Sequence, residues 1–335
     1  MTWYAIALSA GLSFLFFVAV FRPLELLFPA KPGQRFFRPA WFTDLCFYLG
    51  QYFFWNGLTL CVLAQISGWL DSIVSSEFRS AVASQPWWLQ AVEVVLLSDL
   101  ITYWGHRLQH RVGFLWRFHA VHHSAEHLDW LAGHREHPLD SVYTLVIVNL
   151  PAFVLGFPIE TLAGFIAFRG LWALYIHSNI RLPTGPLRML LGAPELHHWH
   201  HDRDRDAGNY ANLSPLMDLL FGTYRCPDHE PEHFGLNEPA PKTYLGHLLK
   251  PLLPRRADPT FVEIDGQPEK AQAECHALVR VGMVVATPHA HAYVGMAPRA
   301  GLVLDEQAVT SPPTPAPGRR RGRRPAGDRS TTPSR

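Results

Sequence analysis

The stretch WYAIALSAGLSFLFFVAVF, residues 3–21, contains no charged side chain and decides the class of fold. A helix that spans a membrane needs about 20 apolar residues, and this run is close to that length. A second charge-free run, residues 45–70, is long enough to span with some tilt. No basic segment precedes Trp3 and no small-residue cleavage site follows Phe21, so we expect an anchor helix and not a cleaved signal peptide.

Two further apolar blocks follow along the chain. Residues 87–104 form a third candidate span, although it carries two acidic residues. Residues 142–176 form a fourth block, which is interrupted by Pro151 and by Gly156-Phe157-Pro158, so we expect a hairpin of two short helices, either re-entrant or spanning. The sequence therefore predicts an all-α, polytopic membrane bundle of about four to five membrane helices or half-helices.

Composition narrows the classes of function. The chain of 335 residues is 48% hydrophobic and only 17% charged, which fits a membrane protein. The net charge of +1 gives no indication of nucleic-acid binding. Its 4 cysteines are scattered without a CxxC motif, so we expect neither a disulfide framework nor a thiolate metal site. Histidine, with 19 copies, is the unusual residue.

The histidines gather in three short segments with helical spacing. The first has two at i and i+4, and the other two each have three at i, i+3 and i+4, so each set shares one helix face. His198 points about 100° away from His197 and is not expected to bind. Eight neutral imidazoles exceed the needs of one structural zinc and indicate two metal ions. These candidate ligands are His106, His110, His119, His122, His123, His197, His200 and His201.

Other residues have weaker patterns. His137 and His177 lie on the expected histidine side of the membrane and are either ligands or ordinary polar residues. Asp99 precedes His106 by two helical turns, so it is either a partner for the N–H of a ligand or a polar residue facing a wet interior. For any single histidine, an interfacial or hydrogen-bonded role is the ordinary interpretation, but clustered imidazoles would repel one another as cations unless a metal kept them neutral.

The distribution of Lys and Arg predicts the orientation. Arg22, Lys31, Arg35 and Arg38 follow the first run, and further arginines follow the third. Positive residues favour the cytoplasmic side, so we expect a multi-pass protein with its histidine clusters and its C-terminus in the cytoplasm, the histidines forming a cap on the bundle.

The sequence resembles the fatty acid hydroxylase/sterol desaturase superfamily of membrane non-haem diiron enzymes. The resemblance covers about residues 90–225 and is carried by these segments: DLITYWGHRLQH (99–110), WRFHAVHH (116–123), REHPLD (135–140), HSN (177–179), HHWHHD (197–202) and NYANLSPLMDLLFGTY (209–224). It implies two metal ions, normally iron, with O2 as co-substrate. The family's box histidines match the eight candidates above, and its further ligand positions match His137 and His177.

The resemblance implies an oxidoreductase that hydroxylates or desaturates a lipid, such as a sterol or a fatty acid, with electrons supplied by a separate reductase or carrier. Zinc remains possible, because imidazole suits both metals. The alternative is a membrane metal transporter or metal-binding protein, which would also use clustered histidines. We expect three regions: membrane helices and a loop in 1–85, the di-metal catalytic domain in 86–225, and a mostly disordered extension rich in Pro, Ala and Arg in 226–335.

Overall fold

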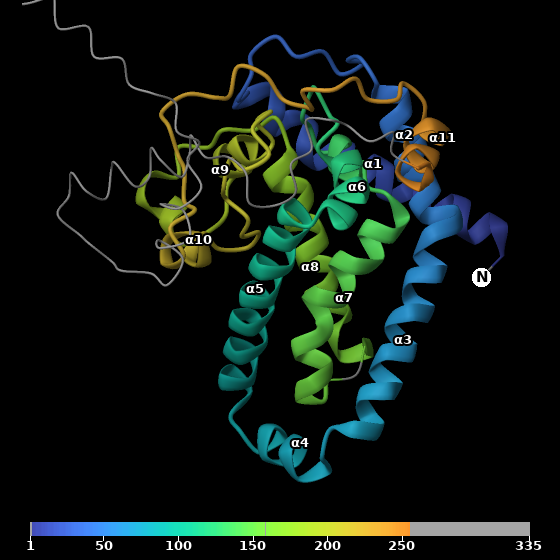
Figure 1. The fold of residues 1–335 in the computed structure, drawn as a ribbon, viewed down its shortest axis with the longest axis vertical. Coiled ribbons are helices and arrows are strands. Elements are labelled where there is room, and N and C mark those ends of the chain that lie inside the picture. Colours follow the sequence, from blue (N-terminus) through green and yellow to red (C-terminus); the bar gives the residue numbers. More distant parts are fainter. Residues whose placement is uncertain (1, 158, 255–335) are drawn as a thin grey trace, which may run out of the picture. The chain divides into compact units, whose positions relative to one another are not determined.

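The computed structural model describes residues 2–157 and 159–254, and within these ranges the chain is helical without a β-strand. Four long helices lie beside one another, as Figure 1 shows: α3 (Asn56–Ile73), α5 (Trp87–Arg111), α7 (Pro138–Leu155) and α8 (Ile159–His177). The short helix α4 (Ser76–Ala83) joins α3 to α5 at the lower end of this bundle. The prediction of an all-α bundle is confirmed.

Three helices in the described ranges are long and apolar enough to cross a membrane, judged by length and composition: α1 (Trp3–Leu27), the continuous helix Trp41–Ile73, and α7. Leu162–His177 is a shorter apolar helix. The third predicted span lies in α5, which is not among the three, because its two acidic residues and several amide and hydroxyl side chains lower its mean hydropathy. The helices confirm a membrane protein.

The predicted hairpin of residues 142–176 consists of α7 and α8. Pro138 at the first position starts α7, where its missing N–H costs nothing. Gly156, with a φ of 94°, ends α7 in the left-handed conformation that glycine adopts most easily. Pro151 lies within α7 and does not end it. Of the two predicted breaks, only the one at Gly156 separates the helices.

Close packing aligns α5 with α7. A Cβ added at Gly105 would lie 2.2 Å from Cδ1 of Ile147, so the glycine lets the two helices approach. In Figure 1, α1 crosses the upper part of the bundle and does not run alongside α3 and α5. Its buried face contacts the histidine end, where the Tyr48 hydroxyl donates to the carbonyl of Ala10 at 2.6 Å and Phe21 stacks on Trp130.

Short helices gather at the end of the bundle where α5 and α8 terminate (Figure 1). They are α2 (Trp41–Gly50), α6 (Gly113–His122), α9 (Pro194–His200), α10 (Leu216–Leu220) and α11 (Tyr244–Leu249), with a π-helical turn (Gln51–Trp55) between α2 and α3 and 3-10 turns at Ala132–His134, Gly185–Met189 and Lys250–Leu252. A buried ionic network ties this end together: the Arg38 guanidinium donates to Asp44 and Asp129, and Arg135 also donates to Asp44. Arg38, which contributed to the predicted orientation, is therefore neutralised inside the protein.

Part of the predicted C-terminal extension belongs to this folded region. Phe47 packs edge-on against Tyr244, and the indole N–H of Trp199 donates to the carbonyl of His229 at 2.8 Å. Residues 226–254 therefore pack against the histidine end. The prediction of disorder for 255–335 lies outside the described residues.

Candidate metal centre

Nine buried or partly buried histidines meet in two adjoining groups. Seven of them lie on α5, α6, α8 and α9, and the other two, His123 and His201, directly follow α6 and α9. In each group, one ring nitrogen of every member lies within 4.8 Å of the corresponding nitrogens of the others. The two groups touch, since the rings of His123 and His201 stack with centroids 4.4 Å apart. The first group is His106, His110, His119, His123 and His200, and the second is His122, His177, His197 and His201.

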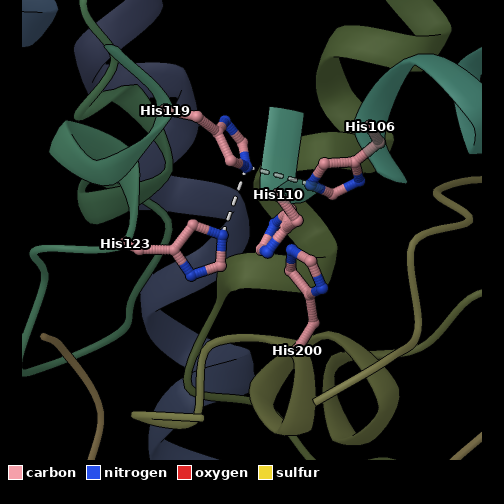
Figure 2. A group of neighbouring side chains, drawn as sticks. All are labelled: His106, His110, His119, His123 and His200. Atoms are coloured by element: carbon pink, nitrogen blue, oxygen red, sulfur yellow. Dashed lines mark hydrogen bonds between the residues drawn. The ribbon is translucent and has the colours of Figure 1, made fainter. Parts of the chain in front are cut away.

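The first group combines the ends of α5, α6 and α9. Figure 2 shows its five rings turned toward a common centre. Nε2 of His119 lies 3.1 Å from Nε2 of His106 and 3.2 Å from Nε2 of His123. His110 and His200 complete the group, with ring centroids 4.7 Å apart.

The second group combines α6, the last residue of α8, and α9. Nε2 of His177 lies 2.9 Å from Nε2 of both His122 and His197, and His201 lies 3.1 Å from His197. The i, i+3, i+4 spacing within α6 and α9 divides each motif between the groups: His119 and His123 face one group, and His122 faces the other.

One loop, residues 205–210, orients three rings of the first group through backbone carbonyls. Nδ1 of His110 donates to the carbonyl of Arg205 at 2.7 Å, that of His200 to Gly208 at 2.8 Å, and that of His106 to Tyr210 at 2.8 Å. Because each neutral ring donates from Nδ1, its Nε2 carries a lone pair.

Gly208 and Asp218 hold this loop in place. Gly208 has a φ of 85°, and a Cβ there would lie 2.2 Å from the carbonyl oxygen of Thr223. The Asp218 carboxylate accepts hydrogen bonds from the backbone N–H groups of Tyr210 and Ala211 at 2.8 and 2.9 Å. Residues 209–224, which carry part of the family resemblance, thus position the candidate ligands.

Asp140 orients the fourth ring of this group. Its carboxylate accepts from Nδ1 of His119 at 2.9 Å and from the side-chain amide of Gln109 at 2.6 Å. Neither residue was predicted from its sequence pattern, although Asp140 ends the segment REHPLD (135–140). In the second group, Nδ1 of His122 donates to the carbonyl of Arg135 at 3.2 Å, and Arg135 is held by the buried ionic network.

The arrangement of nitrogens fits metal ions. Nε2 of His106 and Nε2 of His119 both carry lone pairs, so at 3.1 Å they cannot hydrogen-bond to each other. Two nitrogens bound at right angles to one ion, at about 2.1 Å each, would be about 3.0 Å apart. Nε2 of His110 and Nε2 of His200 are buried without a hydrogen-bond partner among the described residues, which leaves both available as ligands.

The electrostatics favour the neutral, metal-binding form of the rings. Burial lowers the pKa of His119, His200 and His201 well below the usual imidazole value, and neighbouring imidazoles lower it further. Neutral imidazole is the form that binds a metal, so no proton has to be displaced near neutral pH.

The structure brings together nine of the ten predicted ligands, and His177 joins the eight box histidines. His137 lies outside both groups: its Nδ1 caps the start of α7 by accepting from the N–H of Leu139, and Nε2 donates to the carbonyl of Leu248. His198 also lies outside, since its ring contacts Glu230 and the carbonyl of Ser178. Asp99 pairs with Arg169 at 2.8 Å and, among the described residues, makes no hydrogen bond to a candidate ligand.

A cavity of about 680 Å³ leads from the long helices to the histidines. Apolar side chains of α1, α7 and α8 form much of its wall, and its histidine end is lined by His106, His119, His122, His177 and His197. This volume lies within the range of pockets that bury small organic ligands.

Fold and site together define a helical membrane protein whose two adjoining histidine groups can hold metal ions. The sequence model of the fatty acid hydroxylase family matches residues 91–223, which contain all nine of these histidines. This part of the chain therefore matches the fatty acid hydroxylase family, the family that its sequence segments resemble.

Curated relatives agree with that assignment. The ornithine lipid hydroxylase OlsE of Rhizobium tropici is 32% identical over 170 residues, which cover 49% of this chain and 51% of the relative. The alkylglycerol monooxygenase of Homo sapiens is 33% identical over 157 residues, covering 46% of this chain and 34% of the relative. The chain thus spans about half or less of these relatives. No solved structure matches it.

Proposed function

We propose that this protein is a membrane-bound oxidase that uses two iron ions and O2 to hydroxylate or desaturate a lipid. The observation that carries the proposal is the convergence of five and four neutral imidazoles at the end of one apolar cavity. Five nitrogens exceed the four of a structural zinc site, and imidazole suits iron.

The cavity supports a lipid substrate. Its wall contains Phe16 and Phe17 of α1, a helix apolar enough to cross a membrane, and Leu174 of the shorter apolar helix α8. The matched relatives include enzymes named for ornithine lipids and for alkylglycerols. Both names describe lipids with long apolar chains, which such a cavity would accept from the bilayer.

Iron together with O2 supplies the oxidising power that removal of hydrogen from an unactivated C–H bond requires and that side chains lack. In hydroxylation, one lipid C–H group, O2, two electrons and two protons give an alcohol and water. The two electrons require a separate reductase or electron carrier, and we include such a partner in the proposal. The chain's own residues orient the site: Asp140 and the loop 205–210 fix the ring nitrogens, and the apolar wall excludes water from the reacting carbon.

We further propose that the chain crosses the membrane more than once, with the histidine end on the cytoplasmic side. The proposed orientation rests on the distribution of Lys and Arg along the sequence and on the apolar helices. Cysteine labelling tests it. In sealed vesicles of known orientation, a cysteine at exposed Asp228 should react from the cytoplasmic side and one at exposed Glu77 from the other. The reverse pattern would contradict the orientation.

Metal content and lipid analysis test the function together. We expect the purified protein to hold two irons per chain, and cells with the protein to contain an oxidised lipid that appears only when O2 is present. Tightly bound zinc, metal transport into vesicles and an unchanged lipid profile would instead support the transporter interpretation and refute the oxidase.

A further inference from the structure

The end of the cavity that lies away from the histidines is polar. Asp99 and Thr102 on α5, Asn149 on α7 and Arg169 on α8 form what we call the polar floor. Nη1 of Arg169 donates to Asp99 at 2.8 Å, with both side chains buried between helices. Thr102, Asn149 and Arg169 line the cavity. An ion pair within apolar helices is costly and is usually retained for a function.

Three atoms of the polar floor have no hydrogen-bond partner among the described residues. They are Oγ1 of Thr102, Oδ1 of Asn149 and Nη2 of Arg169, and all three are buried. An unsatisfied buried polar group costs roughly the desolvation of that group, so three together at one cavity end indicate a bound polar molecule or group. They offer both donors and an acceptor.

Helix geometry gives the distance from the polar floor to the histidines. Asp99 precedes His106 by seven residues, or about 10 Å of helix rise, and Arg169 precedes His177 by eight, or about 12 Å. Thr102, one turn before His106, lines the same cavity. Asp99 and Arg169 therefore lie about two turns below the candidate metal ligands, and Thr102 lies about one turn below them.

The packing of α7 places the third unpartnered atom at a similar depth. Gly105 of α5 contacts Ile147 and Tyr143 of the antiparallel helix α7. One turn earlier on α5 thus corresponds to a slightly later residue on α7, so Asn149 lies near the level of Thr102. The polar floor is thus a layer formed by three helices, one to two turns below the candidate ligands.

From this layer we infer that the polar floor binds a neutral hydrogen-bonding group of the lipid, a hydroxyl or an amide on a long apolar chain. This rests on the proposed function and adds a substrate class to it. Asp99 already neutralises Arg169, and no other Lys or Arg lines the described part of the cavity, so an anionic group would lack a counter-charge. A hydroxyl or amide matches the donors and the acceptor. The carbon presented to the histidines then lies about 6 to 12 Å from that group.

Binding of two probes that differ by one hydroxyl tests the inference without turnover. Purified protein in detergent is equilibrated with radiolabelled hexadecane or 1-hexadecanol at equal mole fraction in the micelles, and the retained probe is counted. We expect wild type to retain hexadecanol at least about fivefold better, the factor for one hydrogen bond. The double variant Thr102→Val, Asn149→Leu should retain both probes equally, and Thr102→Val alone should lose part of the preference.

The matched control is Thr59→Val, because Thr59 on α3 is buried and lines the same cavity outside the polar floor. It should keep the wild-type preference. The Asp99–Arg169 pair stays intact in every variant, so no buried charge is left alone. Equal retention of both probes by wild type, or an undiminished preference in the double variant, would overturn the inference. Metal content is measured on the same samples, so absence of iron would refute the proposed function and leave the test of the floor valid.

Discussion

Replacing Asp140 by Asn tests how this carboxylate prepares the first histidine group to bind metal. Both groups that approach this carboxylate are donors: Nδ1 of His119 at 2.9 Å and the amide of Gln109 at 2.6 Å. An asparagine offers one oxygen acceptor and one NH2 donor, so only one of them keeps an acceptor. If His119 instead accepts from the NH2 group, its proton moves to Nε2, the nitrogen that faces the other rings, and this nitrogen can no longer bind a metal.

The expected loss of metal affinity is 10- to 100-fold, the usual effect of removing a hydrogen-bond partner of a ligand, or about 1.4 to 2.8 kcal/mol. The assay is iron per chain at equilibrium with a graded series of chelator concentrations. Asp140→Asn should fall from two ions to one at a chelator concentration 10- to 100-fold lower than wild type requires, because only the first group loses an oriented ligand. Asp228→Asn, the same change at an exposed position, should match wild type.

Retention of both ions by Asp140→Asn up to the wild-type chelator concentration would refute the reasoning. Equal weakening of both ions in Asp140→Asn but not in Asp228→Asn would show that the two groups do not hold separate ions.

Three further predictions address the rest of the site. His122→Ala should abolish lipid oxidation and lower bound metal while leaving membrane insertion intact. His127→Ala, outside both groups, should leave oxidation, bound metal and insertion unchanged. Lipid analysis and metal counts measure these effects, and full turnover by His122→Ala would contradict the assignment. Gly208→Ala should lower the melting temperature and the metal content, because its Cβ would meet the carbonyl of Thr223. Gly222→Ala, also at positive φ but with open space around it, should cost only about 1–2 kcal/mol of left-handed strain. Equal shifts of the melting temperature in the two variants would refute the steric argument. Removing iron with a chelator should lower the melting temperature, because an ion at 1,000 times its Kd stabilises the folded state by about 4 kcal/mol. Added Fe²⁺ should restore the melting temperature. An unchanged melting temperature after chelation would count against tight binding.

The local spacing of the histidines was sufficient to predict most of the site. Intervals of three and four residues place imidazoles on one helix face whatever the rest of the chain does, so His119, His122 and His123 could be read directly. His177 stands alone in its helix and was carried by position and resemblance. The division into two groups depends on how α5, α6, α8 and α9 meet, which spacing within one helix does not contain.

Two of the predicted residues lie outside both histidine groups, one because of a partner on another helix and one because of a local backbone contact. Asp99 does share a helix face with His106, but Arg169 on another helix lies closer and takes the carboxylate. His137 precedes a proline at the start of a helix, a position where a side chain can cap the backbone, and there it accepts from the N–H of Leu139. The Asp99 carboxylate is thus bound by a residue distant in sequence, and the His137 ring by a nearby backbone N–H. The spacing of the histidines predicts neither contact.

The loop 205–210 makes three of the five imidazoles in the first group depend on one short piece of backbone. Main-chain carbonyls are present whatever the side chain, so a substitution at position 205 or 210 does not remove the acceptor itself. Because one loop orients three rings, a motion that displaces the loop would remove the hydrogen bonds of His106, His110 and His200 together. Release of that ion should therefore be all-or-none, at a rate set by the opening of the loop and not by the breaking of any single nitrogen–metal bond.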